Sequence, residues 1–192
     1  MLRTSLLRIR DRFSQKGLSH RIVHIKAGKQ MSSRPRISPS VTPGMVIGLL
    51  DVVSGHGGKT DLAKIAIDLQ SDVDDLLPVI EVAETLGFLS VENGDVMLTD
   101  LGEKLVKAMP SKKKLLLRNA ILNVEPFATA FKLIKSRREF SAEELFEELS
   151  KVKELGEEYR DPEQIHHMLL EWLLYTETVR YNGDEKKFQV KS

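Results

Sequence analysis

Residues 60–101, TDLAKIAIDLQSDVDDLLPVIEVAETLGFLSVENGDVMLTDL, decide the fold of this chain. Thr60 is a favourable N-cap residue, because its hydroxyl can accept a hydrogen bond from a free backbone N–H of the first turn. Apolar residues then recur at helical spacing: Leu62, Ile65, Ala66 and Leu69. A second helical pattern starts at Ser71 and contains Pro78, which predicts a kink or a start near Leu77. Gly87 ends this second helix.

A hairpin follows the two predicted helices. Asn93 and Gly94 form a strong two-residue turn signal between expected strands at residues 88–91 and 96–99. In this register Glu92 faces Asp95, and the like-charge pair favours a looser turn. Thr99 then caps a short helix that ends before Pro110. Helix, helix and hairpin in this order predict a winged helix-turn-helix.

A similar order recurs in the second half of the chain. Residues 111–138 form a long helical pattern with an expected kink at Pro126. Ser141 and Glu144 have the spacing of a capping box, and Asp161 precedes a proline as an N-cap does. Residues 179–190 read as a hairpin around Asn182-Gly183, in which Arg180 would face Glu185.

The predicted fold class is mainly α with small β-hairpins (α+β), built as tandem winged-helix-like units. The predicted units are residues 43–110, a winged-helix unit, and residues 111–192, a second helical unit with a C-terminal hairpin. Residues 1–42 are predicted to be a basic N-terminal arm followed by a Pro/Ser-rich linker, because serine and proline dominate residues 31–43.

The charge of the 192-residue chain is strongly divided. Its net charge is +1, but residues 1–36 hold ten Arg and Lys residues against one Asp, which gives +9 there and −8 in the remainder. We call residues 1–36 the basic arm. An apolar stripe in it allows a basic helix that contacts a membrane surface or nucleic acid, or a transit peptide. The interpretation we favour is a poorly ordered tail, or translated sequence upstream of the true start of the domain, because isolated helices this short are marginal in water. The stripe comprises Leu2, Leu6, Ile9 and Phe13.

Composition excludes several classes of function. The chain has no Cys, so disulfides, thiolate metal sites and thiol catalysis are excluded. No apolar run has the length of a membrane-spanning helix, and no signal peptide is evident. A soluble protein of the cytoplasm, peripheral to a membrane at most, is expected.

The second predicted helix is acidic. Five carboxylates and no Lys or Arg lie between residues 71 and 86: Asp72, Asp74, Asp75, Glu81 and Glu84. A winged helix reads DNA with this helix, and a carboxylate-rich surface would repel the phosphate backbone. We therefore interpret these five residues as a candidate surface for a protein partner rather than for DNA.

A basic cluster lies near the start of the long helical pattern at residues 111–138. It comprises Lys112, Lys113, Lys114 and Arg118. Four cations so close together can dock on an acidic partner or a phosphate. A solvated helix end is at least as good an interpretation, and both stay open here.

No motif for catalysis, cofactor binding or metal binding emerges. Gly58-Lys59-Thr60 resembles the end of a phosphate-binding loop. That loop also requires a glycine five residues before Gly58, where this chain has Val53. Glu163, His167 and Glu171 share a helix face, yet zinc sites usually need more His ligands and a second element. We expect no enzyme activity, no cofactor and no metal.

Several short motifs resemble one known family. They are Gly48-Leu49-Leu50, Asp61-Leu62-Ala63, Val73-Asp74-Asp75-Leu76-Leu77-Pro78, Ala83-Glu84, Leu86-Gly87-Phe88, Gly94-Asp95, Leu98-Thr99 and Leu101-Gly102. Together they resemble the AAA-associated C-terminal domain found behind the ATPase of nitrate/sulfonate/bicarbonate-type ABC transporters. The resemblance covers about residues 41–190 and is strongest in the first unit.

The resemblance implies a non-catalytic, regulatory or interaction domain whose partner is an ABC transporter ATP-binding subunit or its membrane complex. The chain shows no phosphate-binding loop, ABC signature or Walker B strand, so action on a separate ATPase, or a split or truncated gene, is expected. A homodimer is compatible with the fold. The alternative function is a winged-helix DNA-binding transcription regulator that contacts nucleic acid through the basic arm.

Overall fold

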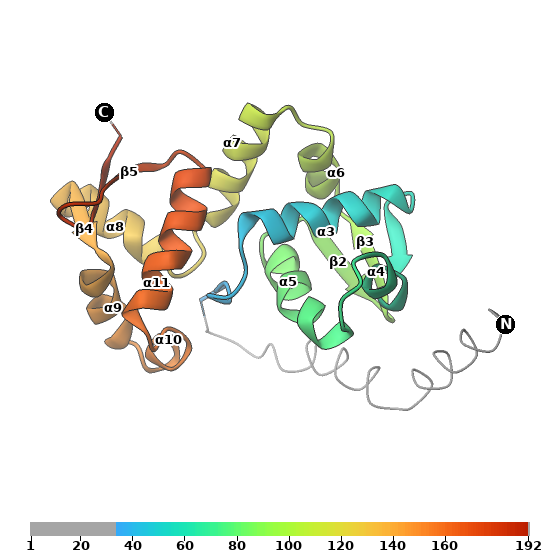
Figure 1. Cartoon of the computed structure of the whole chain (residues 1–192), viewed down its shortest axis with the longest axis horizontal. Coiled ribbons are helices and arrows are strands. Elements are labelled where there is room, and N and C mark those ends of the chain that lie inside the picture. Colours follow the sequence, from blue (N-terminus) through green and yellow to red (C-terminus); the bar gives the residue numbers. More distant parts are fainter. Residues whose placement is uncertain (1–33, 192) are drawn as a thin grey trace, which may run out of the picture.

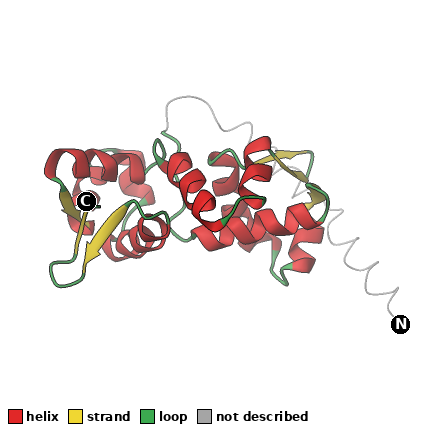
Figure 2. Cartoon of the chain, turned by 90° about the horizontal axis from the view of Figure 1, so that it is seen from above, coloured by secondary structure: helices red, strands yellow, loops and turns green. Residues whose placement is uncertain are grey.

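The computed structural model describes residues 34–191, so the expectations for most of the basic arm, including its apolar stripe, lie outside the described residues. The described elements gather into two groups that lie side by side along the long axis, with α7 (Pro110–Ile121) on the upper side between them (Figure 1). The view turned by 90° shows the same elongated arrangement (Figure 2). Helices dominate both groups, and each group contains one small sheet.

The first group surrounds an antiparallel sheet with strand order β1-β3-β2. Its elements are α3 (Pro43–Gly55), β1 (Lys59–Asp61), α4 (Leu62–Asp68), α5 (Val73–Thr85), β2 (Leu89–Glu92), β3 (Asp95–Leu98) and α6 (Asp100–Val106). The apolar helix α3 contacts α4, α5, α6 and the sheet, so it forms the centre of this group. Four of its side chains are fully or almost fully buried: Val46, Leu49, Leu50 and Val53.

The second group repeats this plan around a sheet with strand order β4-β6-β5. Its elements are α8 (Phe127–Arg137), β4 (Glu139–Ser141), α9 (Ala142–Ser150), α10 (Lys153–Glu158), α11 (Pro162–Leu169), the π-helical turn η1 (Leu170–Leu174), β5 (Val179–Asn182) and β6 (Lys187–Val190). The predicted class, mainly α with small β-hairpins, is confirmed. The capping box of Ser141 with Glu144 and the N-caps at Thr99 and Asp161 are confirmed as well.

Both sheets contain a third strand that the sequence does not predict. Strand β1 pairs with β3, and β4 pairs with β6, over three residues each. Thr60 therefore lies within a strand, and the N-cap of α4 is Asp61, whose side chain accepts a hydrogen bond from the Ala63 N–H. Three residues are too few to show the alternation of apolar and polar side chains by which a strand is recognised in a sequence. A strand this short forms only because a neighbouring strand supplies its hydrogen bonds.

Both hairpins form as predicted, but the shape of the first turn and the cross-strand pairing in the second hairpin differ from the prediction. Glu92 pairs with Asp95 directly across Asn93-Gly94, so the expectation of a looser turn is wrong. Both turn residues have positive φ, 53° and 90°, as a tight two-residue turn requires. Lys59 Nζ lies 2.8 Å from Asp95 Oδ2 and offsets the repulsion. In the second hairpin Arg180 pairs with Gln189 rather than Glu185.

The prolines also act differently from the prediction. The helical pattern of residues 111–138 is two separate helices, α7 and α8, and Pro126 lies between them rather than at a kink. Pro110 is the first residue of α7, where its missing N–H costs no hydrogen bond. Helix α5 begins at Val73 and includes Pro78, so the alternative of a start near Leu77 is wrong, and the kink at Pro78 stays a prediction.

Residues 34–42 are fixed against the second group, although their composition is that of a linker. The side chains of Ile37 and Val41 are buried. The Ile37 N–H donates to the Glu125 carbonyl at 3.0 Å, and the Glu125 N–H donates to the Pro35 carbonyl at 2.8 Å. The Tyr159 hydroxyl lies 2.8 Å from the Ile37 carbonyl and 2.7 Å from the Glu125 carbonyl. Backbone pairing and a buried phenol therefore hold the segment that leads into α3.

We expect Tyr159→Phe to lower the free energy of unfolding by about 1–3 kcal/mol at neutral pH, because two buried carbonyls lose their shared donor. Burial raises the pKa of the Tyr159 phenol. A raised folded-state pKa means that this stabilisation is complete below the unfolded phenol's pKa of about 10 and declines as the pH rises above it. Urea unfolding at neutral and alkaline pH should therefore show the difference between the two proteins narrowing above about pH 10.

The matched control is Tyr181→Phe, which alters a partly exposed ring packed on Phe188 at 4.9 Å. If the free energies of unfolding of the unmodified protein and of Tyr159→Phe differed by the same amount across this pH range, the role given to the phenol would be contradicted.

Candidate interaction surfaces

The five acidic residues predicted to bind a partner lie on or next to one helix. We call them the acidic face; they are Asp72, Asp74, Asp75, Glu81 and Glu84. Asp72 is the N-cap residue of α5, and Asp74 and Asp75 are in its first turn, where the helix dipole favours negative charge. The apolar side of the helix packs on α3, α4 and β2, which leaves the carboxylates on the outer side. All five are exposed except Glu84, which is half-buried.

The acidic face extends toward the second group. Although Glu81 as a whole is exposed, desolvation of its carboxylate by neighbouring protein atoms raises its pKa, and the negative charges of Glu158, at the end of α10, and of Glu84 raise it further. Glu158 Oε2 also lies 3.4 Å from Arg36 Nε. The negative charge of Glu158 on α10 is thus near enough to affect Glu81 on α5, which sequence spacing could not reveal.

The predicted basic cluster is largely engaged within the chain. Arg118 donates to the Thr176 carbonyl, at 2.6 Å from Nη2, and to the Glu177 carbonyl at 2.9 Å. Lys114 Nζ lies 2.5 Å from Glu177 Oε1, and Lys113 Nζ lies 3.9 Å from Asp51 Oδ1. These three cations attach α7 to the residues after η1 and to α3, where Arg118 satisfies carbonyls beyond the end of the helix.

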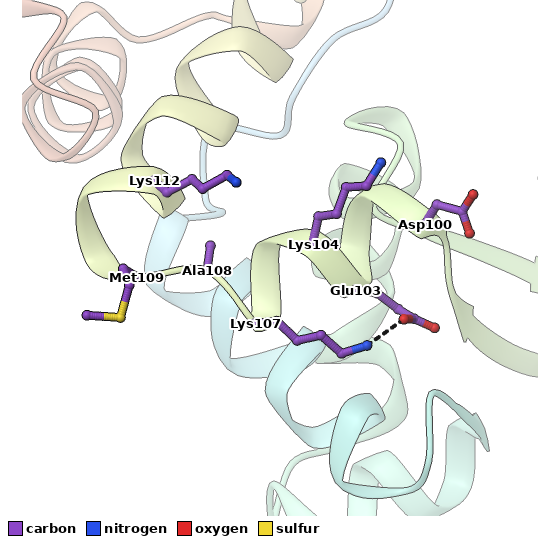
Figure 3. Close-up of a pocket in the computed structure, with 7 residues that line it drawn as sticks. All are labelled: Asp100, Glu103, Lys104, Lys107, Ala108, Met109 and Lys112. Carbon is purple, nitrogen blue, oxygen red and sulfur yellow. Dashed lines mark hydrogen bonds and ion pairs between the residues drawn. The ribbon is translucent and has the colours of Figure 1, made fainter.

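Lys112, the remaining member of the cluster, lines an open groove between α6 and the start of α7 (Figure 3). The groove has a volume of about 510 Å³. Its lining residues are Asp100, Glu103, Lys104, Lys107, Ala108, Met109 and Lys112. Figure 3 shows Lys104 on α6 and Lys112 on α7 on opposite sides of the groove, whereas Lys107 reaches to Glu103, with Nζ 2.7 Å from Oε2.

Met109 is the most exposed large apolar residue of the described chain, at 75%. An apolar side chain between cations suits a protein partner, because methionine is flexible and adapts to the shape of its contact. Sequence reasoning identified Lys112 and missed Lys104, Lys107 and Met109. The available signal was Met109 itself, an apolar residue directly before the proline that begins α7.

Within residues 34–191, no three His, Asp or Glu side chains lie close enough together to hold a metal ion. His167 and Glu171 are both exposed on α11 and η1. In the same part of the chain, none of the helices combines the length and the apolar character needed to cross a bilayer.

Comparison with known protein families gives a match. The profile of a family described as the C-terminal AAA-associated domain matches residues 63–182, more than half of the chain. No curated protein and no solved structure matches the chain. The matched residues begin in α4 and end with β5, and they include the acidic face, the groove and most of the second group. The chain belongs to the family of C-terminal AAA-associated domains.

Proposed function

We propose that this chain is a non-catalytic domain that binds the ATP-binding subunit of a nitrate/sulfonate/bicarbonate-type ABC transporter and regulates its ATPase rate. The observation that carries the proposal is the match of residues 63–182 to the family described as the C-terminal AAA-associated domain, since this description supports an ATPase as the partner. The proposal includes a cytoplasmic location at the inner side of the transporter. It assigns ATP hydrolysis to the partner and none to this chain.

The groove between α6 and α7 is the surface that we propose for this contact. Exposed methionine and lysine side chains line it, and the acidic face lies on a different helix. Burying Met109 against a partner would remove apolar surface from water, and Lys104 and Lys112 would select a partner with carboxylates beside an apolar patch. We interpret each group of elements as a winged-helix-like unit adapted to bind protein, since α5 carries five carboxylates where DNA recognition would need cations.

The test is the binding of purified full-length protein to ABC ATP-binding subunits purified from the same cells, together with ATPase rates with and without it. We expect saturable binding and a changed ATPase rate. The double variant Met109→Ser/Lys112→Glu should weaken binding about tenfold or more, because exposed apolar anchors carry much of an interface's energy.

The matched control, Met45→Ser/Lys153→Glu, makes the same chemical changes at exposed positions of α3 and α10 and should leave binding within about twofold. Absence of binding and of any rate effect would overturn the proposed function. Equal weakening by the two double variants would refute the groove as the contact surface.

A further inference from the structure

Helix α7, at the upper edge of the molecule (Figure 1), carries apolar side chains on two opposite sides. Leu117 and Ile121 are buried against the rest of the fold, whereas Leu115 and Leu122 are 50% and 43% exposed. Seven residues separate these two exposed leucines, so they lie on one side of the helix, about 10 Å apart along its axis. We call Leu115 and Leu122 the outer leucines. They are an apolar surface that the fold itself leaves uncovered.

The segment that contains the outer leucines is strongly basic. Residues 104–124 hold six Lys and Arg residues and no Asp or Glu, although residues 37–192 as a whole have a net charge of −8. Three of these cations contact α3 and the residues after η1, as described above, and Lys107 pairs with a carboxylate of its own helix. Lys104 and Lys112 have no ion-pair partner in the described part of the chain. Two cations therefore remain available beside the exposed leucines.

The groove and the outer leucines form one continuous surface. Lys112 lines the groove and lies one helical turn before Leu115, so α7 leads from the groove to the outer leucines (Figure 3). A groove between two helices suits a third helix, which anchors its apolar side through residues at i, i+3, i+4 and i+7. One such repeat of seven residues spans about 10 Å, the same length as the separation of the outer leucines.

We propose that this surface binds an amphipathic, acidic helix of the partner. The apolar side of that helix contacts the outer leucines, and its carboxylates lie between Lys104 and Lys112. Asp100 lines the groove beyond Lys104, away from Lys112, and repels carboxylates there, which favours one direction of the bound helix (Figure 3). The inference rests on the proposed function for the identity of the partner, since it names the kind of element by which the ATP-binding subunit is recognised.

Charge favours this occupant over the others that such a surface can have. Lysine beside leucine also suits an anionic membrane, but the net charge of −8 over residues 37–192 opposes the approach of the protein to an extended negative surface. A symmetric contact between two α7 helices would bring Lys112 of two chains together without a carboxylate on either outer side. A partner helix with its own carboxylates meets only the local positive charge.

The test uses the full-length, isotope-labelled protein and two synthetic peptides of about 20 residues, a length at which a helix can form alone. Both carry leucines at helical spacing on one side; one has glutamates beside them, and the other has lysines in the same places. We expect the acidic peptide to shift the amide NMR signals of Lys104, Lys112, Leu115 and Leu122 saturably. The basic peptide should bind at least tenfold more weakly, and added salt should reduce this difference.

Leu115→Ser/Leu122→Ser should weaken binding of the acidic peptide about tenfold, because the variant removes both apolar anchors. The matched control, Ile67→Ser/Val152→Ser, makes the same kind of change at exposed positions of α4 and of the N-cap of α10, and should change binding by less than about twofold. The amide spectrum of each variant reports whether the fold is intact.

Several outcomes would overturn the inference. Equal binding of the two peptides would exclude charge selection, and equal weakening by the two double variants would exclude the outer leucines. Vesicles of phosphatidylserine and phosphatidylcholine that shift the same amides and displace the acidic peptide would assign the surface to a membrane. Shifts of these amides on raising the protein concentration alone would assign it to a second copy.

The same variants separate this inference from the proposed function. If the ATP-binding subunit binds the protein and Leu115→Ser/Leu122→Ser leaves that binding unchanged, the inference is wrong while the proposed function stands. If the subunit does not bind or change its ATPase rate, the proposed function is wrong, and the inference fails as a description of that contact whatever the peptides show.

Discussion

Gly102→Ala is expected to lower the free energy of unfolding by about 3 kcal/mol or more, because the added methyl group has no space. A Cβ atom built on Gly102 would lie 2.1 Å from the carbonyl oxygen of Phe88 and 3.2 Å from Leu98 Cδ2. The first of these atoms belongs to the backbone, so it cannot rotate away as a side chain can. Relief requires α6 to move away from the end of α5 and from the hairpin.

Thr99 fixes this close approach. Its hydroxyl donates to the Gly87 carbonyl at 2.6 Å and accepts from the Gly102 N–H at 3.1 Å. Its own N–H donates to the Phe88 carbonyl at 3.0 Å. Moving α6 would strain all three hydrogen bonds, which explains why the expected cost exceeds that of an ordinary helix substitution.

Gly48→Ala is the matched control. Gly48 lies within α3, and a Cβ built there meets no other atom within 4 Å. Alanine favours a helix over glycine, so this variant should be more stable by about 0.5–1 kcal/mol. Chemical denaturation of the three proteins measures both effects. A loss below about 1 kcal/mol for Gly102→Ala would contradict the geometry described for α6.

Trp172→Ala is expected to lower the free energy of unfolding by about 4 kcal/mol, the range found for large aromatic residues removed from a core. Trp172 is fully buried, and its ring lies 5.7 Å from that of Phe127. The indole N–H donates to the Val41 carbonyl at 2.8 Å. The alanine variant would lose the packing and leave this carbonyl without its donor.

Two further variants separate these contributions. Trp172→Phe keeps much of the apolar volume and removes the donor, so about 1–3 kcal/mol should be lost. Leu174→Ala truncates a side chain two residues away that is 40% exposed, and it should cost less than about 1 kcal/mol.

Denaturation gives the energies, and hydrogen exchange of the Ile37 amide reports the attachment of residues 34–42, because this N–H donates to the Glu125 carbonyl. Faster exchange should accompany both Trp172 variants. Unchanged exchange in Trp172→Ala would show that the indole does not hold the segment.

The sequence predicts the features that depend on neighbouring residues. Asn93-Gly94 places the first hairpin, because its turn needs positive φ at both positions. The capping box of Ser141 with Glu144 and the Asp161-Pro162 start of α11 are likewise confirmed. Each of these signals acts over two to four residues, so no knowledge of the tertiary structure is required. The resemblance to the AAA-associated C-terminal domain, which rests on other short motifs in the first half of the chain, is confirmed by the match over residues 63–182.

Features that depend on distant residues appear only in the tertiary structure. Strands β1 and β4 exist because β3 and β6 supply their hydrogen bonds. Arg118 binds backbone carbonyls 58 and 59 residues away, so its position in a run of cations gave no indication of this role. Likewise, residues 34–42 have the composition of a linker, but Glu125, Tyr159 and Trp172 fix their backbone. Local conformational preference determines the turns and the helix caps. Buried backbone N–H and C=O groups must also be paired, and the whole chain decides which groups become their partners.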